Sequence, residues 1–401
     1  MVLVGLLAGV AGAATTVLLH FVEHLTYHYS FGTLLSGVGG SSPVRRALGP
    51  MIGGALAGFG WWLLRRRGDV PSLTTTIEEC RPIPRWRMSF DAGLQVLLVG
   101  SGASLGREGA PRQLAAALGD LGTSRWALTP RDRQILLACA AGAGLGAVYS
   151  VPLGGALFAA RIVLRSWHPR VVGTALITSS LAVAVSAPVT HLTHPIEWPN
   201  ASLSYFFLAL AVVVAPLSVA VGFGFDKLMK LARPTPQFCS WTLIPTIAVA
   251  GLATGIASIW WPELPGNGRS ILTVSVDAGL TLGGAAVILL LKPLLTALFL
   301  RAGAVGGMIT PALATGAAAG SVATLALNQF VGTDIGVAAA SLTCAAGVLA
   351  ITQRAPAFAG LFVWELARPP YWLLVVFLVA AFAAHGLRLL SERRAATASA
   401  E

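Results

Sequence analysis

The sequence has little charge, and acidic residues are the scarcer kind. Only 11% of its 401 residues are charged, with 16 Asp and Glu against 27 Lys and Arg, whereas a soluble domain carries roughly 25%. Hydrophobic residues make up 55% of the chain, and the mean hydropathy is +0.76. This composition excludes an ordinary soluble domain and predicts an all-α integral membrane protein.

Groups that carry enzyme chemistry are few and scattered. The four cysteines lie far apart in the sequence, so neither a zinc site nor a redox dithiol is expected. The seven histidines are dispersed, and no Ser-His-Asp set, pair of catalytic carboxylates or phosphate-binding loop stands in a suitable setting. We therefore expect no catalytic residue, no metal and no cofactor. The cysteines are Cys80, Cys139, Cys239 and Cys344.

Long apolar runs recur along the whole chain. A helix needs about 20 predominantly apolar residues to cross a hydrocarbon core of about 30 Å. The 45 glycines and 23 prolines would weaken helices in water, but a membrane tolerates broken helices where the exposed backbone lines a cavity. The first run has no basic segment before it, which favours a membrane helix over a signal peptide. The runs include residues 2–21, 50–64, 205–224, 241–260, 280–300 and 371–387.

The basic residues gather in short loops between these runs. A net charge of +11 would also suit a nucleic-acid-binding protein, but basic loops between apolar runs are typical of the cytoplasmic side of a multi-pass protein. We therefore expect a protein of a bacterial-type inner (plasma) membrane that contacts the lipid bilayer and binds no nucleic acid. The basic clusters lie at 65–67, 81–87, 131–133, 227–233 and 388–394.

Two segments about 200 residues apart read alike, as in a duplicated transporter half. Cys-Ala-Ala-Gly at 139–142 precedes Val-Pro-Leu-Gly-Gly-Ala-Leu-Phe at 151–158. The same four residues at 344–347 precede Ala-Pro-Ala-Phe-Ala-Gly-Leu-Phe at 355–362. We interpret the pair as an internal repeat, and chance similarity between Ala- and Gly-rich helices is the alternative.

A glycine-rich break that ends in proline precedes each copy. The first is Gly-Arg-Glu-Gly-Ala-Pro at 106–111 and the second is Gly-Gly-Met-Ile-Thr-Pro at 306–311. A helix that opens at such a proline leaves unpaired backbone N–H groups at the positive end of its dipole. If the halves are inverted, two helix N-termini converge near the bilayer midplane and hold an anion without a full opposite charge. The breaks therefore predict an anion site.

Glu108 lies inside the first break, and a carboxylate within the membrane is costly and by default a functional candidate. When ionised, it can occupy the anion site by accepting the N–H groups. When protonated, or displaced by an anion, it swings out, and this behaviour predicts a gate. The alternatives are an ion pair with Arg107 or a cap on the helix that begins at Pro111.

Two further acids lie near or within apolar segments. Glu365 falls in the apolar segment 359–366, where we expect an ion pair with Arg354 or Arg368 rather than a role in transport. Asp91 is expected to open the helix that precedes the first break.

At these residues the chain resembles the CLC chloride channel and transporter family, from its first helix to about residue 387. The segment 106–111 is similar to the family's G-K/R-E-G-P signature, whose glutamate is the external gate, and 301–311 is similar to its G-G-x-F-x-P signature. Supporting matches are Arg-Pro-Ile-Pro-Arg-Trp-Arg at 81–87 and Arg-Ala-Pro at 354–356, followed by Glu365. Four motifs in the family's order carry the resemblance.

The resemblance implies an anion pathway and assigns residues to it. Glu108 takes the gating and proton-carrying role, and the backbone amides of Met308 and Ile309 face the anion. The residues implied to bind the anion are Gly106, Arg107, Gly109, Gly307, Met308, Ile309, Thr310, Gly68 and Asp69.

The resemblance also implies an architecture. The protein is expected to be a homodimer with one pathway per subunit, each subunit being a CLC-type inverted repeat of tilted and broken helices. The first membrane half is expected at residues 1–200 and the second at 201–390. Residues 391–401 are expected to form a short polar tail, with no regulatory domain.

Three departures from the family pattern bear on the transport mode. The family's G-S-G-I-P loop reads Arg-Gly-Asp-Val-Pro at 67–71, with glycine at the serine position and Asp69 beside the anion path. The internal proton-transfer glutamate falls on Ile162, which cannot carry a proton. The pore-lining tyrosine expected about thirty residues after Glu365 is missing from 390–401. Together these departures argue against the ordinary chloride/proton exchanger.

Several transported ions fit what is left. One interpretation is a channel-like or uncoupled protein that conducts chloride or another halide. A second is the family's fluoride/proton antiporter branch, whose second-half motif carries threonine where this chain has Thr310, although the aromatic residues expected along that branch's pathway are not found near Ser72 and Thr75. From another class, a secondary transporter of organic anions would use helix N-termini in the same way. The sequence leaves the choice among them open.

Overall fold

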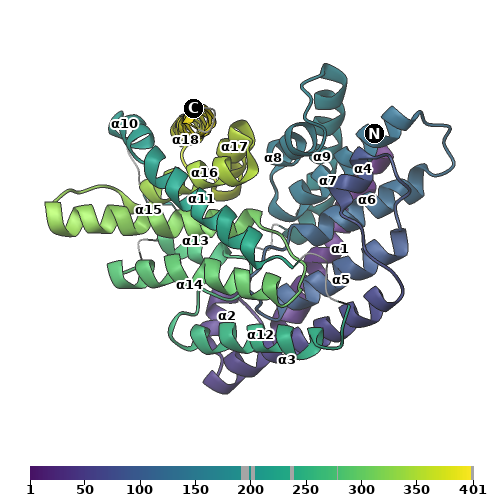
Figure 1. Ribbon diagram of the computed structural model, residues 1–401, viewed down its shortest axis with the longest axis horizontal. Helices are drawn as coiled ribbons and strands as arrows, with labels where there is room; N and C mark the ends of the chain where they lie inside the picture. The colour runs from purple at the N-terminus through teal and green to yellow at the C-terminus, as the bar shows by residue number, and fades with distance from the viewer. Residues whose placement is uncertain (191–197, 200–203, 235–238, 278, 399–401) are drawn as a thin grey trace. The chain divides into compact units, whose positions relative to one another are not determined.

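The computed structural model describes residues 1–190, 198–199, 204–234, 239–277 and 279–398, and the predicted boundary between residues 200 and 201 lies outside them. Within these ranges the chain is helical, as the composition predicts, and Figure 1 shows the course of its helices. They are α1 (Val2–Tyr27), α2 (Leu34–Gly40), α3 (Pro43–Arg66), α4 (Leu73–Glu78), α5 (Arg85–Gly100), α6 (Gly109–Thr123), α7 (Pro130–Tyr149), α8 (Pro152–Leu157), the π-helix η1 (Phe158–Val163), α9 (Pro169–Thr190), α10 (Phe206–Val213), α11 (Ala215–Ala232), α12 (Leu243–Trp260), α13 (Arg269–Val276), α14 (Leu282–Arg301), α15 (Ile309–Val331), α16 (Val337–Gln353), α17 (Pro356–Ala367) and α18 (Leu373–Ala398).

Seven helices of the described residues are long and apolar enough to cross a membrane, and the bent pair α10 and α11 brings the number to eight. Each predicted apolar run falls on one of these helices or on that pair. The helices extend further than the apolar runs: α1 continues to Tyr27, and α3 begins at Pro43 and keeps Pro50 in its interior. Helix α18 runs to Ala398, through most of the segment expected to be a polar tail.

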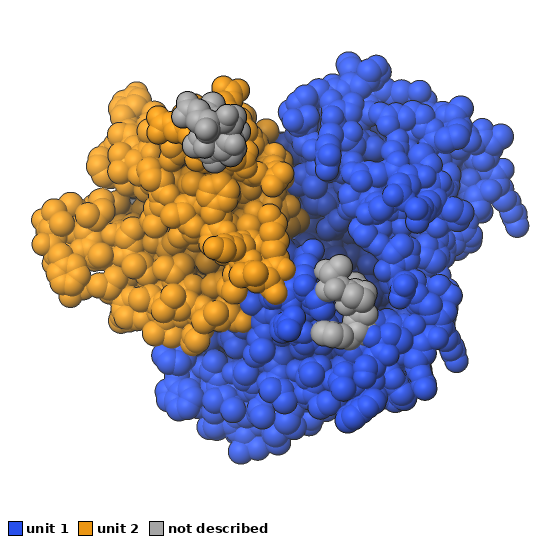
Figure 2. Space-filling view, in the orientation of Figure 1, with its two compact units in different colours: residues 1–194, 232–267, 295–308 blue, residues 195–231, 268–294, 309–401 orange. Residues whose placement is uncertain are grey.

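The chain forms two compact units, coloured separately in Figure 2. Unit 1 consists of residues 1–194, 232–267 and 295–308, and unit 2 of residues 195–231, 268–294 and 309–401. The first glycine-rich break therefore lies in unit 1. The second break is divided: its residues up to Met308 belong to unit 1, and Ile309, the first residue of α15, belongs to unit 2.

Within unit 1, α3 and α12 pack closely because glycines face each other along both helices. A Cβ placed on Gly54 or Gly58 would lie 2.6 Å from a backbone carbonyl oxygen of α12. A Cβ on Gly255 would lie 2.5 Å from the carbonyl oxygen of Arg46, and one on Gly251 would meet the carbonyl group of Pro50. Each helix thus presents two glycines four positions apart, a spacing that lets membrane helices approach at backbone distance.

The two halves share local backbone geometry at the positions of the repeat. Helices α6 and α15 both begin two residues before the proline of their break, at Gly109 and Ile309. At the second element, α7 and α16 both end on a left-handed residue, Ser150 (φ 55°) and Arg354 (φ 54°). Two residues further on, a proline opens α8 in one half and α17 in the other. Chance similarity of composition does not produce the same unusual backbone conformation at matching positions, so these features favour duplication. The division at residues 200 and 390 stays a prediction.

Candidate functional site

The two glycine-rich breaks meet. Gly106 donates its backbone N–H to the carbonyl oxygen of Gly307, and Gly307 donates to that of Gly106, each at 2.9 Å. This reciprocal pair is an isolated antiparallel bridge within the helical chain. It fixes Gly106, two residues before Glu108, against Gly307 of the second break.

Glu108 lies at this junction with no solvent exposure. Its carboxyl group rests against both glycines: a Cβ on Gly106 would lie 2.6 Å from Glu108 Cδ, and one on Gly307 would lie 2.5 Å from Glu108 Cγ. Glu108 is the residue before α6, but its side chain makes no capping hydrogen bond to that helix. The capping alternative is therefore wrong, and glycine is needed at both positions because any side chain would displace the carboxylate.

Arg107 is turned toward other groups. It donates to the carbonyl oxygen of Val148 at 3.1 Å, and its guanidinium carbon lies 4.9 Å from the centre of the Tyr149 ring. The side chain is buried, at 8% exposure. The guanidinium of Arg107 thus contacts a carbonyl group and an aromatic ring. Because these contacts direct it toward Val148 and Tyr149, they favour the gating interpretation of Glu108 over an ion pair with Arg107.

A tyrosine that the sequence reading did not single out contacts the gate candidate. Tyr149, the last residue of α7, donates its hydroxyl to Glu108 Oε2 at 3.2 Å, and Asn267 Nδ2 donates to that hydroxyl at 3.3 Å. The carboxylate therefore accepts a hydrogen bond that stabilises its ionised form. A signal existed in the sequence, since Tyr149 stands three residues before the repeat's Pro152.

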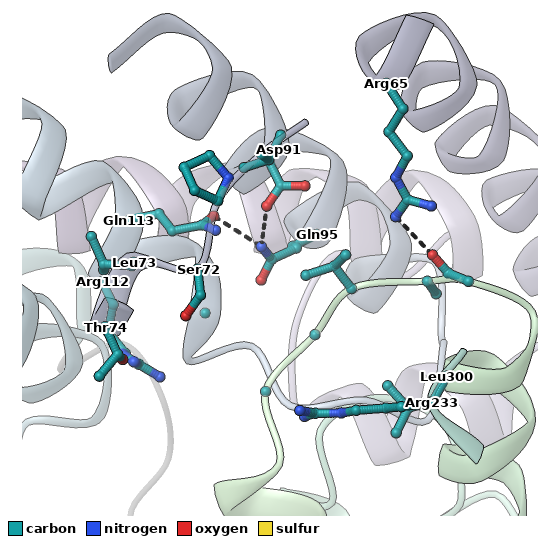
Figure 3. Close-up of a pocket in the computed structure, with 18 of the residues that line it drawn as sticks. Arg65, Ser72, Leu73, Thr74, Asp91, Gln95, Arg112, Gln113, Arg233 and Leu300 are labelled. Atoms are coloured by element: carbon teal, nitrogen blue, oxygen red, sulfur yellow. Dashed lines mark hydrogen bonds between the residues drawn. The ribbon is translucent and has the colours of Figure 1, made fainter. Parts of the chain in front are cut away.

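A cavity of about 310 Å³ opens next to the first turn of α6, and Figure 3 shows its lining. Three arginines and one aspartate line it, so its charge attracts anions. Arg65, buried at the end of α3, donates to the carbonyl oxygen of Gly303 at 2.8 Å and so binds the segment just before the second break. The lining consists of Arg65, residues 70–74, Asp91, Gln95, Gly109, Arg112, Gln113, Arg233, Pro234, Leu300 and residues 303–307.

A buried polar network forms one wall of this cavity (Figure 3). Trp61 Nε1 donates to Asp91 Oδ1 at 2.7 Å, and Gln95 Nε2 donates to Asp91 Oδ2 at 2.8 Å and to Gln113 Oε1 at 2.9 Å. Asp91 was expected to open its helix, and that expectation is wrong: α5 begins six residues earlier, at Arg85, because the motif at 81–87 itself starts the helix. The i,i+4 spacing of Asp91 and Gln95 was the available signal.

The first-half loop contributes differently from what the resemblance implies. Gly68 has a φ of 125°, which favours glycine, and its Cα faces the guanidinium of Arg87. Asp69 is exposed. The residues of this loop that line the cavity start at Val70 and include Ser72, so the structure does not bring Gly68 and Asp69 to the cavity wall. Ile162 lies in the π-helix η1.

In the second break, the structure places Gly307 against Glu108 and buries Ile309 and Thr310 in the first turn of α15. Met308 connects the two and is half-buried. That the N-terminus of α15 faces the same anion as that of α6 stays a prediction. Glu365 is buried on α17, and its predicted ion pair also stays a prediction.

The structure combines membrane-spanning helices, a buried carboxylate at the junction of two backbone breaks and a basic cavity beside it. These are the features of a membrane protein that transports anions. The particular family follows from comparison. The family model described as voltage gated chloride channel matches residues 53–388, and the chain belongs to this family.

Curated relatives agree over nearly the whole chain. The voltage-gated ClC-type chloride channel ClcB of Escherichia coli O81 (strain ED1a) is 30% identical over 393 residues, covering 94% of this chain and 92% of the relative. ClcB of Citrobacter koseri is 30% identical over 400 residues with the same coverage. The predictions of a CLC-family anion transport protein and of a multi-pass protein of the bacterial inner membrane are confirmed.

Solved structures show the same fold. A slow cyanobacterial Cl⁻/H⁺ antiporter superposes with a TM-score of 0.75 at 20% identity, covering 98% of this chain and 97% of that one. A CLC-type fluoride/proton antiporter superposes with a TM-score of 0.71 at 21% identity, covering 96% of this chain and 93% of that one. The predicted all-α CLC-type fold is therefore confirmed.

Proposed function

We propose that this protein moves chloride, or another small halide, across the membrane along a pathway that Glu108 gates. The observation that carries the proposal is the position of the Glu108 carboxylate: fully buried, packed against Gly106 and Gly307, and one residue from the cavity wall at Gly109. The 30% identity to a ClC-type chloride channel over 94% of the chain supports chloride as the first choice of ion.

The mechanism is electrostatic. An anion enters the cavity because three arginines outweigh the single aspartate of its lining. It passes the junction only when Glu108, itself an anion, leaves the position between the two glycines. Protonation of the carboxylate or competition by the entering anion removes it, because both weaken the interaction of the ionised side chain with Tyr149 and the surrounding backbone dipoles.

The test is anion efflux from proteoliposomes loaded with chloride or with fluoride, with a potassium/valinomycin shunt, for the wild type and Glu108→Gln. We expect chloride efflux whose dependence on external pH disappears in the variant. Absence of halide efflux from the wild type would refute the proposal. Efflux that Glu108→Gln leaves unchanged at every pH would refute the gating role.

One observation keeps fluoride/proton antiport as a second candidate. Thr310 is buried at 2% exposure in the first turn of α15, where a hydroxyl donor would suit a small, strongly hydrated ion. Fluoride efflux that drives protons uphill and outpaces chloride efflux would establish it. Inhibition by carboxylates rather than halides would instead indicate an organic-anion transporter.

We also propose that the protein works as a homodimer with one pathway in each subunit, on the basis of its family. Single-molecule photobleaching of labelled protein in liposomes would show two steps per particle, and an excess of single steps would contradict the proposal.

A further inference from the structure

The polar network at the cavity wall extends from Asp91 to Gly109, the residue that follows Glu108. Asp91 and Gln95 lie one turn apart on α5, so Gln95 is about 6 Å further along the helix axis. At that level Gln95 meets the first residue of α6: a Cβ on Gly109 would lie 3.2 Å from Gln95 Cδ and closer still to Oε1. Gly109 directly follows Glu108 in the chain, so the Gln95 amide lies against the neighbour of the proposed gate residue.

The amide of Gln95 has an open acceptor. Both N–H bonds of Nε2 are used, one on Asp91 and one on Gln113. Oε1 is buried, in a side chain with 1% exposure, and accepts no hydrogen bond within the described chain. An unsatisfied buried acceptor is costly. In a cavity that attracts anions, an open acceptor has the wrong polarity for the anion and the right polarity for a proton donor, either water or a protonated carboxyl group.

Asp91 is the carboxylate of this network. It is buried at 3% exposure, and each of its oxygens accepts one hydrogen bond, which leaves each with a further lone pair. Among the lining residues it is the one carboxylate, and the charged groups that line the cavity with it are Arg65 of α3, Arg112 of α6 and Arg233 after α11. Of these, Arg65 interacts electrostatically with Asp91.

We propose that Asp91 is the residue that exchanges protons with the water of this cavity and that Gln95 positions the proton donor between Asp91 and Glu108. A cavity of about 310 Å³ has room for several waters. This inference rests on the proposed role of Glu108 as the gate, because it states how a proton reaches a carboxylate that is fully buried.

The step is a balanced proton transfer. Asp91 takes a proton from a hydronium ion in the cavity, which becomes water, and Asp91 becomes neutral. A water that donates to Gln95 Oε1 accepts that proton and gives one of its own to the Glu108 carboxylate, so that Asp91 returns to its ionised form and Glu108 becomes neutral. No bond between heavy atoms changes. The neutral Glu108 then leaves the junction, and an anion replaces it.

The test separates proton movement from anion movement. Chloride efflux and chloride-driven proton uptake are measured on the same proteoliposomes for the wild type, Asp91→Asn, Asp91→Glu and Gln95→Leu. Asn keeps the shape of Asp91 and an acceptor for Trp61, so we expect chloride efflux within about threefold of wild type and proton uptake reduced at least tenfold. Asp91→Glu should restore proton uptake, and Gln95→Leu should reduce it. Asp334→Asn, an exposed acid far along the chain, is the matched control and should behave as wild type.

Three results would overturn the proposal. One is wild-type chloride efflux with no coupled proton movement, which would leave the anion function standing. The second is a wild-type ratio of protons to chloride in Asp91→Asn. The third is an equal loss of both fluxes in Asp91→Asn and Asp91→Glu, since a residue needed only for folding behaves in that way. A failure of the proposed function looks different, because no halide would then leave the wild-type vesicles.

Discussion

Replacing Gly307 by alanine adds one methyl group where the Glu108 side chain now lies. The new Cβ would be 2.5 Å from Glu108 Cγ, and real Cβ atoms essentially never lie closer than 3.0 Å to another heavy atom of this kind. Since two reciprocal hydrogen bonds hold the backbone of Gly307 and Gly106, we expect the glutamate to yield rather than the main chain. Overpacking of this kind costs about 1–3 kcal/mol. If that cost falls on the closed position alone, its population relative to the other positions of Glu108 drops roughly 5- to 150-fold.

The expected result is a gate that stands open. Chloride efflux from proteoliposomes containing Gly307→Ala should be faster than wild type at neutral pH and should depend less on pH, approaching the behaviour of Glu108→Gln. Gly106→Ala should act alike, because its Cβ would lie 2.6 Å from Glu108 Cδ. Gly306→Ala is the matched control, since its Cβ would approach the Leu105 side chain at 3.0 Å and not the gate.

A double-mutant cycle decides whether the methyl group acts through Glu108. In a Glu108→Ala background the obstructed carboxylate is gone, so Gly307→Ala should change the efflux rate by less than about twofold. An equal effect of Gly307→Ala in both backgrounds would refute the reasoning, because the methyl group would then act on the anion path itself.

Three further predictions concern the hydrogen bond to the gate, the helix contact and a buried ion cluster. Tyr149→Phe removes the hydroxyl that donates to Glu108 Oε2, worth about 1 kcal/mol, so chloride efflux at fixed pH should rise about three- to tenfold; an unchanged rate would show that the bond does not hold the gate. Gly251→Val should lower the thermal midpoint in detergent, at a cost of about 1–3 kcal/mol, because its Cβ would lie 2.6 Å from the carbonyl carbon of Pro50. The control Gly283→Ala on α14, which has open space around it, should leave the midpoint unchanged or raise it. Equal midpoints for Gly251→Val and wild type would contradict the packing. Asp120→Asn breaks ion pairs of 2.7 Å to Arg85 and 2.5 Å to Arg133, and because the arginines are partly exposed we expect a loss of stability of about 1–3 kcal/mol, measured as a lower thermal midpoint. Adding 1 M salt should lower the midpoint of the wild type and leave that of the variant unchanged. A wild-type midpoint that does not depend on salt would argue against the ion pairs.

The sequence was sufficient for the membrane class, the positions of the spans and the acidic residue that lies at the junction of the two breaks. Apolar length is a local property, so the six predicted runs could be located without knowing any contact. The break around Glu108 could be identified for a similar reason, because a carboxylate between glycines and a proline has few structural uses inside a membrane.

The remainder of the site depends on contacts that no local pattern encodes. The basic residues at 81–87 are typical of a loop between apolar runs, yet Arg85 begins α5, so Asp91 lies inside this helix and not at its start. The spacing of Tyr149 from Pro152 and of Gln95 from Asp91 marks both residues, but only the packing of α5, α6 and α7 shows that Tyr149 contacts Glu108 and that Gln95 contacts Gly109. Asp69, a position carried over from a family motif, is exposed and does not line the cavity, so its role in anion binding stays a prediction.

The bridge between Gly106 and Gly307 also bears on how the protein is made. It joins residues about 200 positions apart, so Gly307 is synthesised only after most of the chain. A nascent chain that has not yet reached Gly307 carries Glu108 without the backbone that confines it. The junction of the two breaks therefore forms late in biogenesis, and an incomplete chain held in the membrane contains an exposed intramembrane acid, a feature by which quality control could distinguish it from the finished protein.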